Sequence, residues 1–400
     1  MMLARMALVA AAAATIELAG GTAASAQQTP PGSPSPAASA SATPSPSPTP
    51  YASGAIGGAL LIFGMQSYNP NATGALDTKS GADDQGRNDA SDLLVNASYT
   101  TGYYKFSATA GGYNFPTVGT AINPTFNSFG AACANTSCYT VLPLAQVTYT
   151  SPDSHWTLYG GKLGTLLGAE GAFTYQNVNI ERGLGWALEP VVSRGLHAGY
   201  ANGPWTFAAE YNDGFYTGSH RAVEYEVAWA PSSTTSWTFV GMNPGGNTPG
   251  NLTAAIANQS EYNLMYAHTA GKWQFSPYLL WINSPSSAVL GYTKAESDYV
   301  VSLLGSYAFS PVYSVGFRVE DAQNSAATTD TSPNAFLLYG PGSGATTYTL
   351  TPAFRFAGNG LVRFEWSHVT VRNGIAGGLF GPGGTLTSQN RIGFEVGATR

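Results

Sequence analysis

The stretch YSVGFRVE, residues 313–320, decides the fold. Its apolar side chains occupy every second position and its small or charged side chains fall between them: Tyr313, Val315, Phe317 and Val319 alternate with Ser314, Gly316, Arg318 and Glu320. Successive side chains of a β-strand point to opposite faces, so the stretch predicts a strand that is apolar on one face and polar on the other. The same alternation recurs at 205–212, 223–229, 362–366 and 391–396.

The connections between these stretches alternate in length along the chain. Short turns are expected at 101–102, 151–155, 202–204, 230–236, 269–272, 310–311 and 357–360. Longer polar or Gly-rich loops are expected at 69–91, 114–140, 164–194, 243–259, 283–297, 322–344 and 372–388, with a brief one at 213–220. Tight periplasmic turns and longer outer loops are typical of outer-membrane barrels. We therefore predict an all-β fold, a transmembrane antiparallel up-and-down β-barrel of about 16 strands (range roughly 14–18).

The composition agrees with a membrane barrel and disfavours several other classes of protein. Charged residues make up 10% of the 400 residues and aromatic residues 12%, whereas ordinary soluble domains are about 25% charged. Beyond the N-terminus the sequence has no apolar run of the roughly 18 residues that a membrane-spanning helix needs. The net charge of -6 provides no basic stripe for phosphates, which disfavours nucleic acid as a partner.

The N-terminal segment carries the signals of export. Residues 1–26 resemble a secretory signal peptide, with Arg5 before an apolar run and Ala24-Ser25-Ala26 as the cleavage site. Residues 27–50 are almost wholly Pro, Ser, Ala and Thr. They are expected to form a disordered periplasmic spacer, either a plain tether or a contact to the cell wall or a partner. Residues 51–400 then form the barrel, which places the protein in the outer membrane of a Gram-negative-type bacterium.

Few residues point to a metal, a cofactor or a cross-link. Cys133 and Cys138 are the only cysteines, and in an exported chain they are expected to form a small loop disulfide rather than a metal site. The acidic residues between 77 and 92 lack the spacing of a calcium-binding loop, so a solvated loop is favoured over a cation site: Asp77, Asp83, Asp84, Asp89 and Asp92. No metal site and no cofactor are expected.

If the apolar strand faces meet lipid, the opposite faces line the lumen. Arg or Lys on the lipid face costs about 2–4 kcal/mol at the middle of the bilayer. The alternation therefore places these ionisable side chains in the lumen, as selective, solvated or mutually paired wall groups: Glu210, Glu224, Glu226, Arg318, Glu320, Arg355, Arg363, Glu365, Arg391 and Glu395.

The segment 164–194 follows a regular strand and mixes apolar residues with five charged ones: Glu170, Glu181, Arg182, Glu189 and Arg194. Loops of this length are usually functional or disordered, and this one lacks the low complexity of a disordered segment. The hypothesis is that it folds into the lumen, where its charges narrow the pore and set its selectivity. An ordinary outer loop is the alternative.

Aromatic side chains flank the expected short turns. An aromatic girdle at the membrane interface accounts for the set better than ordinary packing does: Trp156, Trp205, Trp229, Trp237, Trp273, Phe309, Tyr313 and Phe356.

One part of the sequence resembles a known family. The motifs are GKLGTLLG (161–168), ERGL (181–184), RGLHAGY (194–200) and EYNDG (210–214). Together they resemble the OmpL-like β-barrel porin family, also described as β-barrel porin-2. The resemblance implies an outer-membrane channel that extends from about Gly57 to the C-terminus. Such barrels commonly end in an aromatic residue, whereas this chain ends FEVGATR (394–400). Phe394 is therefore the expected signal for the barrel assembly machinery.

The function expected from these features is passive diffusion of small hydrophilic solutes and ions through a porin. The excess of 22 Asp and Glu over 16 Lys and Arg suggests a mild cation preference. The expected partners are outer-membrane lipid around the barrel and the solutes that pass through it. The sequence does not decide between a monomer and a homo-oligomer. One alternative is a plugged structural or adhesive barrel that acts through its surface loops. The other is a barrel enzyme such as a lipase, although the histidines are scattered and no catalytic motif is present: His155, His197, His220, His268 and His368.

Overall fold

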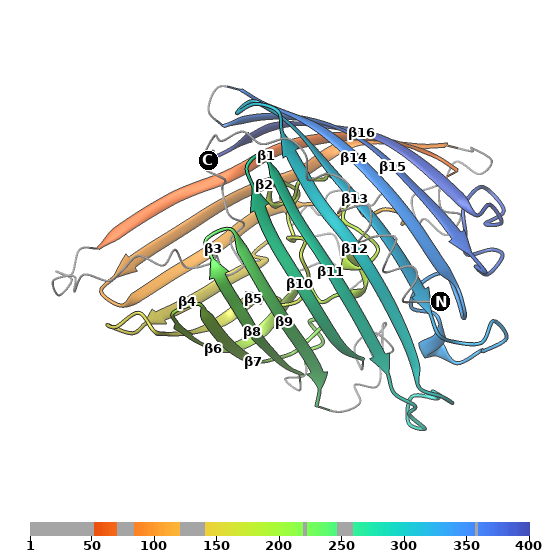
Figure 1. The fold of residues 1–400 in the computed structure, drawn as a ribbon, viewed down its shortest axis with the longest axis horizontal. Coiled ribbons are helices and arrows are strands. Elements are labelled where there is room, and N and C mark those ends of the chain that lie inside the picture. Colours follow the sequence, from red (N-terminus) through yellow and green to blue (C-terminus); the bar gives the residue numbers. More distant parts are fainter. Residues whose placement is uncertain (1–51, 70–83, 121–140, 219–221, 246–258, 357–358) are drawn as a thin grey trace.

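The computed structural model describes residues 52–69, 84–120, 141–218, 222–245, 259–356 and 359–400. Sixteen antiparallel strands lie side by side in chain order and close into a barrel through pairing of β1 with β16 (Figure 1). The strands are β1 (Ser53–Tyr68), β2 (Asp84–Thr101), β3 (Tyr104–Tyr113), β4 (Leu144–Thr150), β5 (Trp156–Gly164), β6 (Val192–Asn202), β7 (Trp205–Asn212), β8 (Ala222–Ser232), β9 (Thr235–Pro244), β10 (Ser260–Ala270), β11 (Trp273–Ser284), β12 (Glu296–Ala308), β13 (Tyr313–Asn324), β14 (Gly344–Phe356), β15 (Gly360–Arg372) and β16 (Ser388–Thr399). The predicted barrel and its strand number are confirmed.

In the part of the chain that the structure describes, helical structure is confined to three short 3-10 turns: η1 (Thr174–Gln176), η2 (Trp186–Leu188) and η3 (Pro333–Ala335). Among the described residues, no helix is both long and apolar enough to cross a membrane.

Alternation sorts the side chains of each strand between the two faces of the wall. On β13, Arg318 and Glu320 are buried inside the barrel, whereas Val315, Phe317 and Val319 lie on the other face. On β7, Trp205, Phe207 and Tyr211 are exposed on the outside, while Glu210 and Asn212 are buried inside. The exposed apolar side chains form the surface that a bilayer covers.

The short turns lie where the sequence predicts them, but one strand begins earlier than predicted. β2 starts at Asp84 and pairs with β1 along its whole length, so Asp89 and Asp92 belong to a strand rather than to a solvated loop. Asp92 is fully buried. This position agrees with alternation. Leu93 and Val95 are exposed on the outer face of β2, so Asp92, one position before Leu93, points to the inside of the barrel. The solvated-loop prediction is wrong for Asp92.

Several predictions fall outside the described residues. They concern residues 1–51 and the side chains Asp77, Asp83, Cys133, Cys138 and His220.

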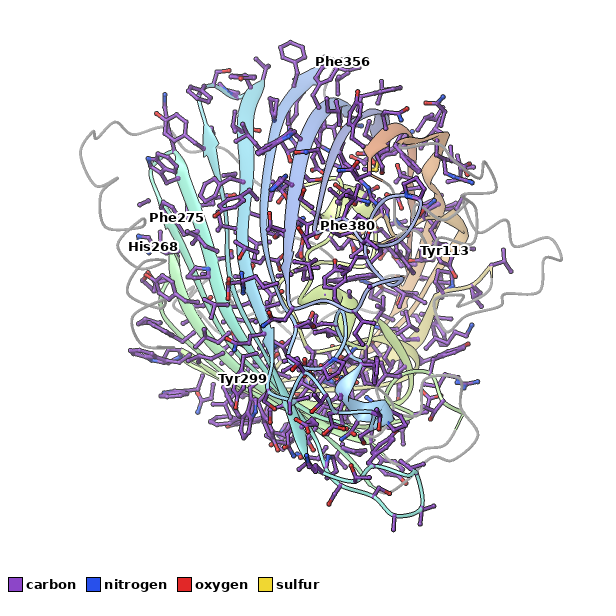
Figure 2. All side chains as sticks on the ribbon, turned by 90° about the vertical axis from the view of Figure 1, so that its right-hand side faces the viewer. Tyr113, His268, Phe275, Tyr299, Phe356 and Phe380 are labelled. Atoms are coloured by element: carbon purple, nitrogen blue, oxygen red, sulfur yellow. The ribbon has the colours of Figure 1, made fainter. Side chains whose placement is uncertain are left out.

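The connection between β5 and β6, residues 165–191, runs inside the barrel. We call it the lumenal loop; it contains η1 and η2. Buried apolar side chains of the described chain form four clusters, and each contains a residue of this loop. Phe173 packs with Leu94 and Tyr113, Ile180 with Phe63 and Met65, and Leu167 with Val240 and Met242. Leu184 and Leu188 join inward-facing residues of β11 to β15, together with Phe380 near the centre of Figure 2. The loop thus contacts the wall on several sides.

Candidate functional site: the lumenal loop and the barrel wall

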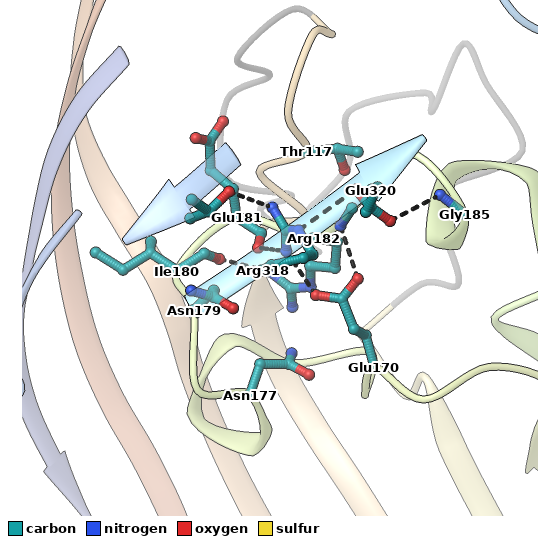
Figure 3. A network of polar contacts seen from close by, with 12 residues as sticks. Thr117, Glu170, Asn177, Asn179, Ile180, Glu181, Arg182, Gly185, Arg318 and Glu320 are labelled. Atoms are coloured by element: carbon teal, nitrogen blue, oxygen red, sulfur yellow. Dashed lines mark hydrogen bonds and ion pairs between the residues drawn. The ribbon is translucent and has the colours of Figure 1, made fainter. Parts of the chain in front are cut away.

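Two buried ion pairs attach the lumenal loop to the wall. Arg318 of β13 lies 2.7 Å from Glu170 and also donates to the carbonyl of Glu181 at 2.6 Å (Figure 3). Arg391 of β16 lies 2.5 Å from the carboxylate of Glu181. All four side chains are at most 2% exposed. Because a buried charge is costly unless it is paired, these contacts fix the loop in one position.

Wall carboxylates also bind the main chain of the loop. Glu365 of β15 accepts hydrogen bonds from the amides of Ile180 at 2.6 Å and Glu181 at 2.8 Å. Glu320 of β13 accepts from the amides of Leu184 at 2.8 Å and Gly185 at 3.4 Å. These bonds satisfy main-chain donors that would otherwise be buried without partners.

The third wall arginine, Arg363 of β15, binds loop carbonyls. It pairs with Glu395 of β16 and donates to the carbonyls of Thr174 at 3.1 Å and Asn177 at 2.6 Å. On the neighbouring side of the barrel, the buried Asp92 accepts from the hydroxyl of Thr174 and from the amide of Tyr175. Both ends of η1 are therefore held by charged side chains.

Contacts at the two ends of the loop reach the opposite wall. Glu224 of β8 accepts from the amide of Leu166 at 3.0 Å and from the hydroxyl of Thr165 at 3.1 Å. Asn263 of β10 accepts from the amide of Gly168 at 2.5 Å and donates to Glu189 at 3.4 Å. The lumenal loop thus bridges the barrel from β8 and β10 to β13, β15 and β16.

Burial raises the pKa of Glu189 to about 8, and the nearby charge of Glu170 acts in the same direction. Glu189 is the loop carboxyl that faces β10, where no arginine contacts it among the described residues. Its protonated form is therefore favoured while the loop is docked.

Two glycines allow close approaches of the loop main chain, Gly183 to the wall and Gly168 to another part of the loop. A Cβ atom added at Gly183 would collide with the carboxylate of Glu320. A Cβ at Gly168 would collide with the carboxylate of Glu189, and Gly168 also has a φ of +84°, which L side chains rarely adopt. A larger side chain at Gly183 would displace either the loop main chain or the carboxylate of Glu320 that binds it.

Arg182 acts within the loop rather than on the wall. Its guanidinium donates to the carbonyl of Ala172 and lies 5.6 Å from the ring centroids of both Phe115 and Trp186. Its main chain pairs with the segment 116–118 through the carbonyl of Pro116 and the amide of Val118. Arg182 therefore links the lumenal loop to the connection that follows β3.

The charges of the wall are divided between two sides. We call Arg318, Arg363 and Arg391 the arginine wall. On the other side, the acidic wall consists of Glu210 of β7, Glu224 and Glu226 of β8, and Glu261 of β10. In the described part of the chain, no Lys or Arg forms an ion pair with any of these four.

Hydrogen bonds hold the acidic wall in place. Glu210 and Glu224 lie directly opposite each other on β7 and β8. Asn212 donates to both, at 3.1 Å and 2.8 Å. Glu210 also contacts His197 at 2.9 Å, whose ring stacks on Tyr159 with a centroid distance of 3.9 Å. Like charges placed opposite each other in a sheet repel, so the hydrogen bonds from Asn212 stabilise the close approach of Glu210 and Glu224.

The structure brings together most of the side chains that the sequence assigned to the pore. The loop residues Glu170, Glu181 and Glu189 contact residues of the wall. The wall side chains that form ion pairs or hydrogen bonds in this network are Arg318, Glu320, Arg363, Glu365, Arg391 and Glu395. The three arginines are buried and paired, however, rather than solvated.

Two predicted pore residues lie elsewhere. Arg194 shares the outer face of β6 with Leu196, pairs with Asp213 at 2.7 Å and stacks over Tyr216. The bounds predicted for the loop included it, but the strand begins at Val192 and alternation turns Arg194 outward. Arg355 has the inward parity but lies exposed at the end of β14, next to a short turn. Neither joins the lumenal loop network.

The aromatic residues that flank the short turns form contacts around the barrel. The rings of Trp205 and Trp229 stack with a centroid distance of 5.9 Å. The rings of Phe309 and Tyr313 stack with a centroid distance of 5.1 Å. Phe356 lies at the rim in Figure 2. Trp273 is half-buried against Tyr307. The other seven are exposed: Trp156, Trp205, Trp229, Trp237, Phe309, Tyr313 and Phe356.

Sequence reasoning missed a second aromatic group and several lumenal partners. The ring centroid of Trp281 lies 5.1 Å from that of Tyr262 and 6.5 Å from that of Tyr299. These rings lie near the loop ends of β10 to β12. The missed partners are Asp92, Asn263 and Glu261. The signal for Glu261 and Asn263 was present, because they alternate with Tyr262 and Leu264 in the sequence.

The histidines of the described chain are dispersed over the barrel. His155 contacts the carbonyl of Ala201, His268 the hydroxyl of Thr235, and His368 the side chains of Asn390 and Thr370. His197 contacts Glu210. No group of three metal-binding side chains comes together among the described residues.

The geometry is that of a membrane barrel with an inward-folded loop, and the family comparison agrees with it. The model of the family described as "Putative beta-barrel porin-2, OmpL-like" matches residues 54–399. The chain belongs to this family. The match reaches from the first strand to the last, so this β-barrel porin-2 protein is an outer-membrane porin, and the resemblance inferred from the motifs between 161 and 214 is confirmed. No curated protein sequence matches it.

Solved porin structures share the fold of this β-barrel porin-2 protein. The anion-selective porin from Comamonas acidovorans has a TM-score of 0.58 at 11% identity, covering 88% of this chain and 100% of that chain. The outer membrane channel DcaP of Acinetobacter baumannii has a TM-score of 0.55 at 11% identity, covering 87% and 97%. OmpT of Vibrio cholerae in its trimer form has a TM-score of 0.54 at 12% identity, covering 87% and 99%. At such identities the likeness concerns the fold alone.

Proposed function

We propose that this protein is a passive, non-enzymatic diffusion channel for small hydrophilic solutes and ions, with the lumenal loop as its constriction and selectivity element. The observation that carries the proposal is the docking of residues 165–191 inside the barrel by charged side chains from opposite walls. A loop fixed in this way sets the free cross-section of a lumen, and the charges around it set which solutes pass.

The charge distribution supports a mild cation preference. The arginine wall is buried and neutralised by Glu170, Glu181, Glu320 and Glu395. The acidic wall has no such counter-charges from Lys or Arg in the described chain, as set out above. Both walls are buried, but the carboxyls of the acidic wall have no Lys or Arg partner in the described chain, so their field favours a cation in the lumen over an anion.

Planar-bilayer recording of the refolded protein tests both parts. Discrete current steps are expected, together with a reversal potential across a salt gradient whose sign reports cation preference. A reversal potential of the opposite sign would remove the cation preference and leave the channel in place.

A second candidate function is a plugged barrel that acts through its outer loops. The observation that favours it is the presence of lumenal-loop residues in all four buried apolar clusters. The two candidates differ in conductance. Protein that is shown to be inserted and yet never conducts would select the plugged barrel.

The remaining parts of the proposal concern export and assembly. Residues 1–26 are removed as a signal peptide, residues 27–50 form a periplasmic spacer, and Cys133 and Cys138 form a disulfide. Phe394, exposed on the outer face of β16, serves the assembly machinery, and the flanking aromatic residues form the interfacial girdle. Association with further copies draws support from the trimer form described for OmpT. Mass spectrometry of the mature protein, intact and reduced, tests the processing site and the disulfide.

A further inference from the structure

Three oxygen-bearing side chains gather at the loop ends of β11 and β12. Ser284 of β11 lies directly opposite Glu296 of β12, and Ile282 lies opposite Asp298. Ile282 belongs to the inner apolar cluster, and side chains opposite each other or two positions apart share a face, so all three point inward. Ser284 lies three positions beyond Trp281, toward the long loop that follows β11. The group is therefore at the outer mouth of the barrel.

Two buried oxygen atoms of this group have no hydrogen-bond partner among the described residues. Asp298 is fully buried; its Oδ1 accepts from Asn324 of β13 at 2.9 Å, whereas its Oδ2 has no partner. The hydroxyl of Ser284, which is also fully buried, has none either. By contrast, both carboxylate oxygens of Glu365 accept from amides of the lumenal loop. Buried polar atoms are nearly always paired, so two neighbouring exceptions point to a bound ligand.

The group also carries negative charge without a counter-charge. Glu296 is 5% exposed and accepts one hydrogen bond, from the hydroxyl of Ser325 at 3.1 Å. Within the described chain, neither Glu296 nor Asp298 forms an ion pair with a basic side chain. Lys294, two positions before Glu296, pairs with Asp330 at 3.4 Å instead. Two buried carboxylates without a counter-charge are costly, and a bound cation removes that cost.

The connection between β13 and β14 covers the group. Asn334 of η3 is fully buried and donates to the carbonyl of Ser284 at 3.4 Å and to that of Lys294 at 2.9 Å. The side chain of Asn334 in turn accepts from the hydroxyl of Ser332. The group is thus enclosed by β11, β12, β13 and η3, which shield its oxygen atoms from bulk solvent.

We propose that Asp298, Glu296 and Ser284 bind a calcium ion at the outer mouth of the barrel. Calcium takes six to eight oxygen ligands at about 2.3–2.6 Å and accepts carboxylates, neutral oxygens and water together. Side chains directly opposite in a sheet have Cβ atoms about 4.5–5.5 Å apart, and diagonal neighbours about 7–8 Å. Two side chains that bind the same ion span such separations.

The three side chains have different roles in this site. Asp298 and Glu296 supply the charge, and Ser284 supplies a neutral oxygen. The group contains fewer than three of the acidic, His or Cys side chains that commonly bind metals, so water provides the remaining ligands. The ion joins β11 to β12 and, through Asn334, steadies the connection that covers it. The site is independent of the proposed constriction, because none of the three side chains forms a hydrogen bond or ion pair with the lumenal loop among the described contacts.

Calcium binding is measured by isothermal titration calorimetry of the refolded full chain in detergent, at constant ionic strength, with calcium chloride as the titrant. We expect one site with a dissociation constant of about 10⁻⁴–10⁻³ M, as in extracellular calcium modules. Asp298→Asn is the main variant and is expected to abolish binding. Its carbonyl oxygen keeps the bond from Asn324, so its amide nitrogen takes the place of Oδ2 and cannot bind a cation. Asp153→Asn is the control, because it removes the same charge from an exposed turn.

Ser284→Ala tests the neutral ligand and replaces Asp298→Asn if that variant does not refold. Its calcium affinity is expected to fall about tenfold, the effect of losing one favourable contact. Without calcium, this substitution removes a hydroxyl that has no partner, so the melting temperature is expected not to fall. Only the increase in the melting temperature that calcium produces should shrink, which a purely structural role of Ser284 would not explain.

Two results would overturn the site. A wild type that binds no calcium would mean that Asp298 is buried in its protonated form, and equal binding by the wild type and Asp298→Asn would place the ion elsewhere. Magnesium, titrated in the same way, is expected to bind more weakly, because it demands a near-ideal octahedron and gives up its water reluctantly. Equal affinity for the two ions would overturn the assignment to calcium.

Discussion

Arg391 of β16 and Glu181 of the lumenal loop form a buried ion pair of 2.5 Å although they are 210 residues apart in the chain. Arg391 also donates to the hydroxyl of Ser67 on β1 at 2.6 Å and to the carbonyl of Thr117 at 2.8 Å. One side chain thus joins the closing strands of the barrel to the segment that crosses its lumen.

Replacing Arg391 by Ala is expected to release the loop at this side of the barrel. The substitution leaves Glu181 buried without its cation, which costs about 3–5 kcal/mol. Arg372→Ala is the control, because its pair with Asp321 is partly exposed and contributes only about 0–1 kcal/mol. Limited proteolysis within residues 165–191 and single-channel conductance should both increase for Arg391→Ala. Equal behaviour of the two variants would show that the pair does not hold the loop.

Gly183→Ala tests whether close approach to Glu320 is required. The new Cβ collides with the carboxylate of Glu320 and thereby weakens its bonds to the amides of Leu184 and Gly185. Gly164→Ala, at the end of β5 directly before the loop, is the matched control, since nothing lies within 4 Å of its added Cβ. Faster amide hydrogen exchange at 184 and 185 is expected for Gly183→Ala alone. Unchanged exchange would mean that the wall accommodates the methyl group without loss of docking.

The docking of the loop should weaken as the pH rises. The pKa of Glu189 is raised from 4.5 to about 8 by burial, so the docked state binds a proton more tightly than the released state does. The stabilisation is therefore complete below about pH 4.5 and is lost as the pH rises through about 8. Proteolysis of the loop is expected to increase over this interval in the wild type. In Glu189→Gln, which cannot ionise at this position, the profile should be shallower than in the wild type, with the remaining slope due to other loop carboxyls such as Glu170, whose pKa burial also raises; the same slope in both proteins would exclude Glu189 as a contributor.

The acidic wall should determine the sign of ion selectivity. Glu226→Gln is the most direct substitution, because Glu226 has no hydrogen bond to the lumenal loop among the described contacts, unlike Glu224. The reversal potential across a salt gradient is expected to move toward zero. Asp153→Asn, in the exposed turn before β5, removes the same charge away from the lumen and is expected to leave the reversal potential unchanged. A larger shift for Asp153→Asn than for Glu226→Gln would place the selectivity outside the lumen.

The fold could be predicted from the sequence because it depends on local signals. Alternation such as that of residues 313–320 and turns such as 202–204 specify strands and their order, and the pairing of the first strand with the last then closes the sheet. The start of β2 was missed because the segment 84–92 is polar on both faces, which resembles a loop.

The site could be predicted only in part. The inward loop and its charged residues were recognisable, since they interrupt a regular pattern. Their partners were not, because pairs such as Glu170 and Arg318 or Glu181 and Arg391 depend on the three-dimensional course of the loop. The sequence left open whether the arginines are selective, solvated or mutually paired wall groups; docking of the loop buries them and pairs them with carboxylates. Arg194 was misplaced because the sequence did not locate the start of β6.

The most direct test of the central claim is single-channel recording of the wild type beside a variant in which residues 170–188 are replaced by a short Gly-Ser linker, both shown to be inserted. We expect discrete steps from the wild type and larger steps from the variant, because removal of the constriction widens the lumen. Equal step sizes in the two proteins would contradict the assignment of the lumenal loop as the constriction, and a wild type that stays silent while the variant conducts would identify the loop as a plug.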